Sequence, residues 1–517
     1  MGPLPSTATE RLVALFIAYI GFYFVYMFIL AVYRLTLHPL APFPGPFLCR
    51  ISWHYQMYFE AIKGGKMLER LPGLHEKYGP IVRINPNEVH IKDPEVFHEI
   101  YGQKTKFTKD PFAYSFGVPT AINVLLDPIV HRQRREMLNP SFSKRRINML
   151  EDLMYEELDR VFEKITEYAN KGMVIPIQEA YYCYAGDIIS RVVFGKCLNL
   201  IDMPDFAMDK IEEIRGFTKG VWISIHFGAI RNLMMNMPQW LVRMMNESWV
   251  GIIDFTEHEA SEAMKNYHRP GREPKSARDE TIFDRLLDAN QQSEKERGMK
   301  SKFGLKELTD EGVSLLIAGL ETTATTITYA TYYFQKYPHV QPRIMEELSS
   351  IKPDTDGRMP IKQIEAQPYF AGFIKETLRF SHGIPGRLTR IIPEGGLVVP
   401  AAGKTIPAGS VVGMSHLMIH KDPELFESPE EFKPERWLGD EGKALDHWLV
   451  SFSKGTRDCI GKNLAFTEMH LILANVFMTY DIELCPGSDE AMVMTDRAIA
   501  RPTSNLRVNA KLKVRTF

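Results

Sequence analysis

The hydrophobic pattern of the chain opens with one long uninterrupted apolar run. Residues 12–33 (LVALFIAYIGFYFVYMFILAVY) carry no charged side chain and are flanked by Arg11 and Arg34. At about 1.5 Å per residue, a helix of this length crosses a bilayer core of about 30 Å. We predict an uncleaved transmembrane anchor within residues 1–34, because the run is long for a signal peptide and no small-residue cleavage site follows it. The alternative is a buried core helix.

A proline-rich stretch follows the anchor. Residues 38–46 (HPLAPFPGP) contain four prolines, which favour extended backbone and stop a helix. We interpret residues 35–50 as a hinge that is either a stiff spacer or an ordinary linker. Basic residues after the apolar run outnumber the single Arg11 before it, which predicts that the body, residues 51–517, faces the cytoplasm.

The pattern in this body is mostly helical. Short apolar runs at 81–84 and 89–91 around Asn-Pro-Asn predict a strand, a turn and a strand, and punctuated runs between 391 and 414 predict further short strands. Helices are expected at 145–170, 308–337, 363–381 and 461–479, and residues 256–300 are expected to contain an exposed loop between helices. The fold class is therefore mainly α with a minor β-sheet region, whose strands pair over long range.

Composition excludes some function classes. The 517 residues contain 62 Lys and Arg against 64 Asp and Glu, a formal net charge of −2, whereas a nucleic-acid binder would carry a basic excess. Five scattered cysteines form no disulfide framework. We expect reduced thiols and no nucleic-acid partner.

One cysteine lies in a distinctive setting, the stretch FSKGTRDCIG at 452–461. Cys459 precedes a predicted helix and follows Arg457, and both features lower a thiol pKa and so favour the thiolate that binds metals. Gly455 and Gly461 would let the backbone pass close to a flat ligand. A single thiolate cannot complete a zinc site, but it can be the one protein ligand of a haem iron.

The spacing of Phe452, Gly455, Arg457, Cys459 and Gly461 resembles the cysteine loop of the cytochrome P450 superfamily of haem-thiolate monooxygenases. The resemblance implies the cytochrome P450 fold after a single N-terminal transmembrane helix. It also implies haem b, with Cys459 as the axial metal ligand and Phe452 and Gly461 beside the cofactor. The alternative for Cys459 is a buried, inert thiol.

A charged cluster accompanies this loop. Glu376 and Arg379 are three residues apart and share a helix face, and Arg436 in the segment PERW is available to join them. The family uses such a triad to lock the core beneath the haem. The resemblance therefore implies a structural triad of Glu376, Arg379 and Arg436.

A second companion lies in the long helix predicted at 308–337. The segment AGLETT (318–323) places Gly319 and threonines in a helix interior, where they are poor helix formers and can open the helix locally. It resembles the family's oxygen-binding segment, in which Glu321 and Thr322 would relay protons for dioxygen cleavage. The alternative is a packing kink without chemistry.

Basic residues that match the family's propionate-binding positions form the third companion. His131 and Arg135 are one helical turn apart, with His131 where many members carry tryptophan, so that Arg135 is the better match. Arg457 and Arg387 match further positions. Arg390 competes with Arg387, and the sequence leaves that choice open.

The resemblance also implies partners. The chain shows no flavin or dinucleotide fingerprint, so the electrons would come from NADPH through a membrane-bound NADPH–cytochrome P450 reductase, with cytochrome b5 as a further candidate. The implied location is the endoplasmic reticulum membrane, single-pass, with the catalytic domain cytoplasmic. A basic face would steer the reductase, or would be ordinary solvated surface; it comprises Arg132, Arg134, Lys454, Arg457 and Lys462.

Apolar segments match the family's pocket-lining regions and indicate a lipophilic substrate. The chain is most similar to filamentous-fungal members of secondary metabolism, among them the trichodiene-oxygenase group, so we favour a terpenoid over a polyketide or an alkaloid. Two other functions remain open: an isomerase or dehydratase that needs no O2, and a non-catalytic haem-binding protein.

Overall fold

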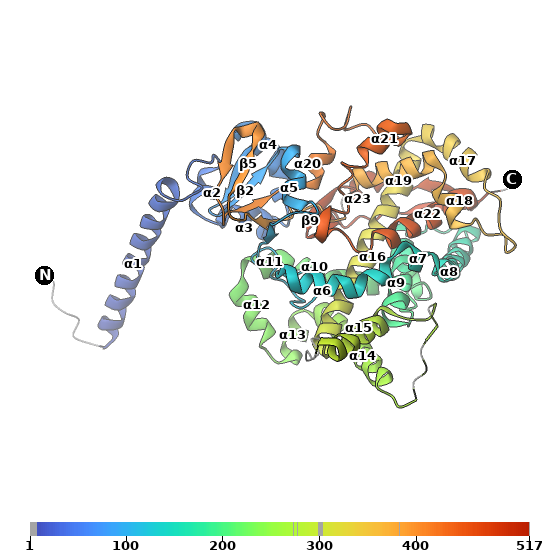
Figure 1. Ribbon diagram of the computed structural model, residues 1–517, viewed down its shortest axis with the longest axis horizontal. Helices are drawn as coiled ribbons and strands as arrows, with labels where there is room; N and C mark the ends of the chain where they lie inside the picture. The colour runs from blue at the N-terminus through green and yellow to red at the C-terminus, as the bar shows by residue number, and fades with distance from the viewer. Residues whose placement is uncertain are drawn as a thin grey trace.

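The computed structural model describes residues 8–271, 273, 275–276, 278–297, 303–381 and 383–515. Residues 1–7 of the predicted anchor segment lie outside the described residues. The body is built mostly of helices, with the strands of the largest sheet at the end near helix α1, Ala8–Thr36 (Figure 1). This confirms the predicted fold class.

Helix α1 (Ala8–Thr36) projects away from this body (Figure 1). Its segment Arg11–Thr36 has a mean hydropathy of 2.3, and it is the one helix among the described residues that is long and apolar enough to cross a membrane. Large apolar side chains such as Phe22 and Phe28 are exposed along it. The helix is therefore compatible with a membrane anchor.

Arg83 fastens the segment after α1 to the body. It is fully buried in strand β1 (Ile81–Asn85). Its Nη1 donates to the carbonyl oxygens of Arg34 at 2.9 Å and Leu40 at 3.2 Å, and its Nη2 donates to that of Pro86 at 2.9 Å. These bonds hold the start of the proline-rich stretch against the sheet.

The largest sheet joins distant parts of the sequence. Its five strands have the order β1-β2-β7-β4-β3, with β2 at Glu88–Ile91, β7 at Val411–Gly413, β4 at Arg390–Ile391 and β3 at Thr108–Lys109. Strands β2 and β7 are parallel, and Glu88 is paired with Val411. The predicted long-range pairing is confirmed. The three two-stranded sheets are β5 (Leu397–Val399) with β6 (Lys404–Ile406), β8 (Tyr480–Leu484) with β11 (Ala510–Val514), and β9 (Met494–Arg497) with β10 (Ile499–Pro502).

Helix α16 (Leu305–Lys336) runs through the middle of the body (Figure 1). It packs against α9 (Ile177–Phe194), α14 (Glu247–Tyr267) and α22 (Lys462–Thr479). The remaining α-helices are α2 (Phe47–Ile51), α3 (His54–Met57), α4 (Met67–Tyr78), α5 (Phe97–Tyr101), α6 (Pro128–Leu138), α10 (Pro204–Lys219), α11 (Val221–His226), α12 (Gly228–Met235), α13 (Gln239–Met245), α15 (Ile282–Arg297), α17 (Gln341–Ser349), α20 (His416–His420), α21 (Gly439–Leu445) and α23 (Ser488–Ala491), together with the four that the next paragraph names.

Two predicted helices are each divided in the structure. The segment 145–170 forms α7 (Lys144–Asn148) and α8 (Glu151–Asn170). The segment 363–381 falls in α18 (Ile361–Glu365) and α19 (Pro368–Phe380), because Pro368 cannot continue a helix but suits the first position of a new one.

Candidate functional site

The loop that carries Cys459 is fixed by close packing. It lies between a short 3₁₀ turn, Gly455–Arg457, and the start of α22. The backbone N–H of Cys459 donates to the carbonyl oxygen of Phe452 at 2.9 Å. Gly455 has a φ of +75°, and a Cβ atom there would lie 2.3 Å from the carbonyl oxygen of Tyr101. Only glycine fits this position, so the loop keeps a fixed place against α5.

Cys459 has an accessible side chain. All five cysteines belong to the described part of the chain, and among them only Cys459 is exposed. Protein atoms nevertheless surround the sulfur. Burial raises the pKa of the Cys459 thiol, and the hydrogen bond from the backbone N–H of Gly461 only partly offsets this rise. The sequence-based expectation of a lowered pKa was therefore wrong for the protein alone. The sequence suggested that the charge of Arg457 would act on the sulfur. In the structure its side chain instead donates to the carbonyl oxygens of Leu125 and Leu126.

The segment of residues 318–323 also has an accessible stretch. In α16, whose neighbouring residues are mostly buried, Ala318 is exposed and Thr322 is half-buried. The Thr322 hydroxyl donates to the carbonyl oxygen of Ala318 at 2.8 Å. A Cβ on Gly383 would lie 3.1 Å from the Cβ of Thr322, and the Gly383 carbonyl accepts from the N–H of Ala500. Three distant segments thus meet at Thr322.

Gly319 has a different role from the predicted one. The helix is continuous from Leu305 to Lys336, so the expected local opening is absent from this described helix. A Cβ on Gly319 would lie 2.6 Å from Cγ1 of Ile189. Gly319 therefore allows α9 to approach α16 closely. A side chain at this position would point toward α9 and not toward the accessible stretch.

Glu321 lies beside Thr322 but is fully buried. One of its carboxylate oxygens, Oε1, accepts from Nη2 of Arg501 at 2.5 Å. Sequence reasoning missed Arg501. The sequence feature that could have identified Arg501 is its position as the one charged residue in the apolar segment AIARP, next to residues that match a pocket-lining region.

Four basic side chains gather near the cysteine loop: Lys109, His131, Arg390 and Arg457. Lys109 and His131 are buried, and so is Arg390, whose Nη1 donates to the Tyr114 hydroxyl at 3.0 Å. The pKa of His131 is lowered to about 3 by burial, then by Arg457 and Lys109. Burial, Arg390 and Arg457 lower the pKa of Lys109 well below its usual value. Arg390 and Arg457 oppose further positive charge on their neighbours, so an anion entering the cluster would be bound favourably.

The competition between Arg387 and Arg390 has a clear geometric outcome. Arg387 is committed to two buried carboxylates, Glu60 and Glu88, each at 2.6 Å. Arg390 belongs to the basic cluster instead. The placement of Arg387 beside a propionate therefore disagrees with the structure, because its charge is already neutralised.

Arg135, the better match in the sequence, has a partner as well. Its Nη2 pairs with Oδ1 of Asp458 at 2.5 Å, and its Nε donates to Asn139 at 3.1 Å. It therefore fastens α6 to the residue before Cys459. His131, the weaker match, is the one that lies in the basic cluster.

The predicted charged triad is in contact. Arg379 reaches both carboxylate oxygens of Glu376, at 2.8 and 3.0 Å. Arg436 donates to Oε1 at 3.0 Å and the Trp437 indole donates to Oε2 at 2.9 Å. The backbone N–H of Lys433 completes the set at 2.9 Å. Since Glu376 is fully buried, these donors compensate for its lost hydration.

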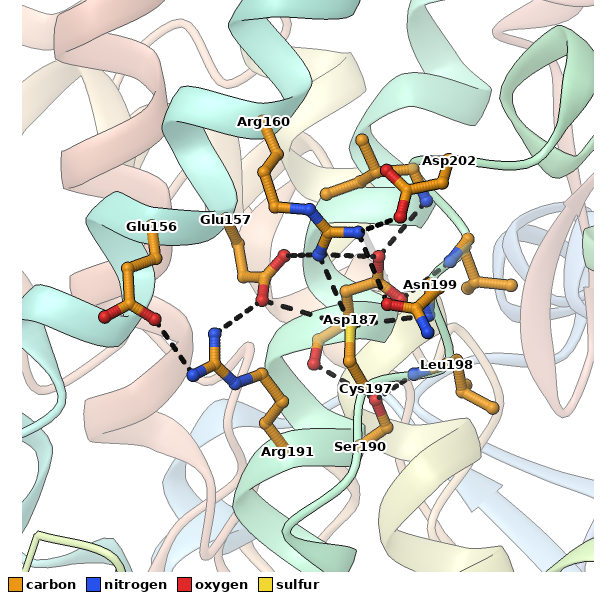
Figure 2. Close-up of polar contacts among 12 residues, drawn as sticks. Glu156, Glu157, Arg160, Asp187, Ser190, Arg191, Cys197, Leu198, Asn199 and Asp202 are labelled. Atoms are coloured by element: carbon orange, nitrogen blue, oxygen red, sulfur yellow. Dashed lines mark hydrogen bonds and ion pairs between the residues drawn. The ribbon is translucent and has the colours of Figure 1, made fainter.

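A second buried cluster brings Glu157, Asp187 and Cys197 close enough to hold a metal ion. Figure 2 shows that arginines already occupy it: Arg160 and Arg191 donate to Glu157. Asp187 accepts from the backbone N–H groups of residues 200 and 201. We interpret the cluster as an ion-pair network that joins α8 to α9.

The predicted basic face is smaller than expected. Arg134 is buried and pairs with Glu311 at 2.6 Å, so it cannot contact a partner. Arg457 is turned toward the interior by the bonds described above. Arg132 and Lys462 are exposed.

A cavity of about 420 Å³ lies between α12–α14 and the start of α16. Its apolar lining includes Met234, Met237 and Trp249, and its polar lining includes Asp254 and Asp310. It has the size and the lining of a small-molecule pocket.

Comparison with known proteins identifies the family of this chain. The cytochrome P450 family model matches residues 44–510. Cytochrome P450 monooxygenase BOT1 of Botryotinia fuckeliana is 33% identical over 495 residues, which cover 93% of this chain and 92% of that protein. Cytochrome P450 monooxygenase macH of Penicillium terrestre is 33% identical, covering 94% of this chain and 95% of that protein. Cytochrome P450 monooxygenase TRI4 of Fusarium sporotrichioides is 32% identical, covering 91% and 89%.

Proposed function

The chain belongs to the cytochrome P450 family and is a monooxygenase, and on this premise we propose that it inserts one oxygen atom of O2 into a lipophilic secondary metabolite. The proposed reaction is RH + O2 + NADPH + H⁺ → ROH + H2O + NADP⁺, with the electrons delivered by a reductase. The observation that carries the proposal is the accessible thiol of Cys459 in a loop that is fixed by close packing against α5.

The residues present fit the haem that the family implies. We assign Cys459 as the thiolate ligand, with Phe452 and Gly461 at its side. The basic cluster of Lys109, His131, Arg390 and Arg457 suits the two negatively charged propionates, because anions would stabilise positive charge on these side chains. When bound through a thiolate, haem supplies the electron-rich iron that favours O–O cleavage.

The chain contributes the protons that the reaction consumes. We assign the Thr322 hydroxyl, which borders the accessible part of α16, as the group that hands a proton to oxygen. Glu321 is the neighbouring acid. Its Oε2 is buried without a hydrogen-bond partner, so it has capacity to take part in a relay.

The substrate we favour is a terpenoid, with a polyketide or an alkaloid as the other choices. This preference rests on the resemblance of the sequence, since the cavity between α12–α14 and the start of α16 includes neither Cys459 nor Thr322 in its lining and also carries Asp254, Glu257 and Asp310. Two fungal relatives named TRI4 support the resemblance to the trichodiene-oxygenase group.

We assign the protein to the endoplasmic reticulum membrane, with α1 as the span and the body in the cytoplasm. The electron donor is then a membrane-bound NADPH–cytochrome P450 reductase, and cytochrome b5 is a second donor. Of the predicted basic face, Arg132 and Lys462 are exposed. We assign them to the electrostatic steering of an acidic flavoprotein.

The test is expression of the full chain together with a reductase in a fungal host, followed by comparison of metabolites with and without the chain. We expect new products that are heavier by one oxygen, labelled from ¹⁸O2, and dependent on NADPH in microsomes. Turnover without NADPH would favour an isomerase or dehydratase, and haem binding without any turnover a non-catalytic haem protein.

Replacing Thr322 by alanine tests the proton assignment. We expect product per NADPH to fall by about tenfold or more, with hydrogen peroxide released instead, because oxygen is reduced without a proton donor at the right place. Both quantities are measured in the same reconstituted assay. Thr326→Ala is the matched control, since Thr326 makes the same type of bond one turn further along α16. Unchanged yield in Thr322→Ala would disprove the assignment.

Arg390→Gln and Arg387→Gln separate the two candidate propionate ligands. We expect Arg390→Gln to speed haem transfer to apomyoglobin severalfold, because a propionate loses a cation. Arg387→Gln should instead lower the stability of the body, since Glu60 and Glu88 lose their shared partner. Faster haem loss in Arg387→Gln alone would reverse the assignment.

A further inference from the structure

In the ion pair between Glu321 and Arg501, one nitrogen atom of the arginine has too many acceptors and other polar atoms have no partner. Nη2 of Arg501 lies within hydrogen-bond distance of three acceptors: Glu321 Oε1 at 2.5 Å, Thr218 Oγ1 at 2.5 Å and the Arg215 carbonyl oxygen at 3.0 Å. An NH2 group has only two protons to donate. The three acceptors therefore compete for them.

Other polar atoms of the same ion pair form no hydrogen bond. Arg501 Nε and Nη1 and Glu321 Oε2 are buried without a hydrogen-bond partner. Leaving a buried polar atom unpaired destabilises the fold. A small rotation of either side chain could pair these atoms, so the observed arrangement is not the only good one available.

Two of the three competing acceptors belong to α10. This helix begins with an unfavourable turn, since Asp205, Phe206 and Ala207 have φ values of 47°, 53° and 52°. Its residue Phe217 packs on Gly117, where a Cβ would lie 3.0 Å from the ring. Gly117 lines the 420 Å³ cavity. Helix α10 thus contacts the Glu321–Arg501 pair through Arg215 and Thr218, and through Phe217 it contacts one residue that lines the cavity.

We propose that Arg501 is a positioning residue that sets the place of the Glu321 carboxylate and links it to α10, and through α10 to the occupancy of the cavity. A ligand that shifts α10 changes how Arg501 divides its protons between Glu321 and the helix. Glu321 then moves toward or away from the neighbouring Thr322. The inference rests on the proposed function, because it concerns proton supply at the same site.

Arg507 offers a matched control. It is six residues further along the C-terminal segment and pairs with another fully buried carboxylate, Glu179, at 2.7 Å. Arg507→Gln removes the same type of ion pair without touching Glu321 or Thr322.

The first readout does not need turnover. In the full chain, solubilised in detergent, we expect Arg501→Gln to increase hydrogen exchange in the peptide 208–219 and Arg507→Gln to leave that peptide unchanged. In a double-mutant cycle with Glu321→Gln, the destabilisation by the two changes should not be additive. Unchanged exchange or additive effects would overturn the link between Glu321, Arg501 and α10.

The second readout is coupling in the loaded enzyme. We expect Arg501→Gln to lower product per NADPH by about fivefold or more and to change the solvent deuterium isotope effect on kcat, with KM unchanged. Arg501→Lys keeps the positive charge but lacks the several N–H donors of a guanidinium group. Compared with Arg501→Gln, it should restore the stability and the haem content but not the product per NADPH. Wild-type yield and isotope effect in Arg501→Lys would reduce Arg501 to a purely structural role.

The two readouts separate this inference from the proposed function. If the wild type makes no product with NADPH and reductase, the proposed function fails and so does the role in proton supply. The link from Glu321 through Arg501 to α10 is then still decided by hydrogen exchange and the mutant cycle.

Discussion

Replacing Cys459 by serine is expected to abolish turnover, lowering product formation by at least about a thousandfold, because an alcohol oxygen does not supply the electron density of a thiolate. The reduced protein with carbon monoxide should lose the red-shifted absorbance band of thiolate ligation. Serine is nearly isosteric with cysteine, so the loop packing against α5 should persist. The measurements are the carbon monoxide difference spectrum and product formation with reductase.

Cys485→Ser is the control for this experiment. Cys485 is a half-buried free thiol outside the loop, and its substitution should preserve both the spectrum and the activity. Retention of the thiolate band in Cys459→Ser would mean that another residue binds the iron. The roles of Thr322, Glu321 and Arg501 would then have to be reassigned as well.

The second large effect is expected from Glu376→Gln. The variant leaves Arg379 and Arg436 buried near a neutral amide, which can also no longer accept from all of its present donors. Breaking a buried ion pair in this way destabilises a protein by about 3–5 kcal/mol. We expect most of the protein to be lost to aggregation or to retain little haem. The midpoint of denaturant unfolding and the haem content per chain measure this effect.

Glu430→Gln is the matched control for Glu376→Gln. Glu430 pairs with Lys421 at 2.9 Å, but its side chain is 69% exposed. An exposed pair contributes at most about 1 kcal/mol, so this variant should behave like the wild type. Equal stability of the two variants would show that the Glu376 cluster does not hold the core.

Local pattern was enough to predict several features. The apolar run of α1, the strand–turn–strand at β1 and β2, and the helices α16 and α22 follow from hydrophobic periodicity, which acts within a few turns of chain. The cysteine loop could be recognised because its residues are close in sequence. Glu376 and Arg379 were paired correctly because a spacing of three residues places them on one helix face.

Prediction failed where a side chain could choose between local and distant partners. A glycine in a helix indicates either an opening or a close contact, and only the position of Ile189 shows that Gly319 makes a contact. Arg134 was expected on the surface among its basic neighbours. The structure buries it against Glu311, which is 177 residues away in the sequence.

The sequence by itself therefore determined the family, the long apolar N-terminal helix and the cysteine loop, because each depends on residue types that are close together in the chain. The tertiary structure alone decided which charges meet. Arg387 pairs with Glu60 across 327 residues and Arg501 pairs with Glu321 across 180, and no local spacing records either contact. Electrostatic partners are chosen by distance in space, and for these side chains that distance is set by how the helices and sheets pack.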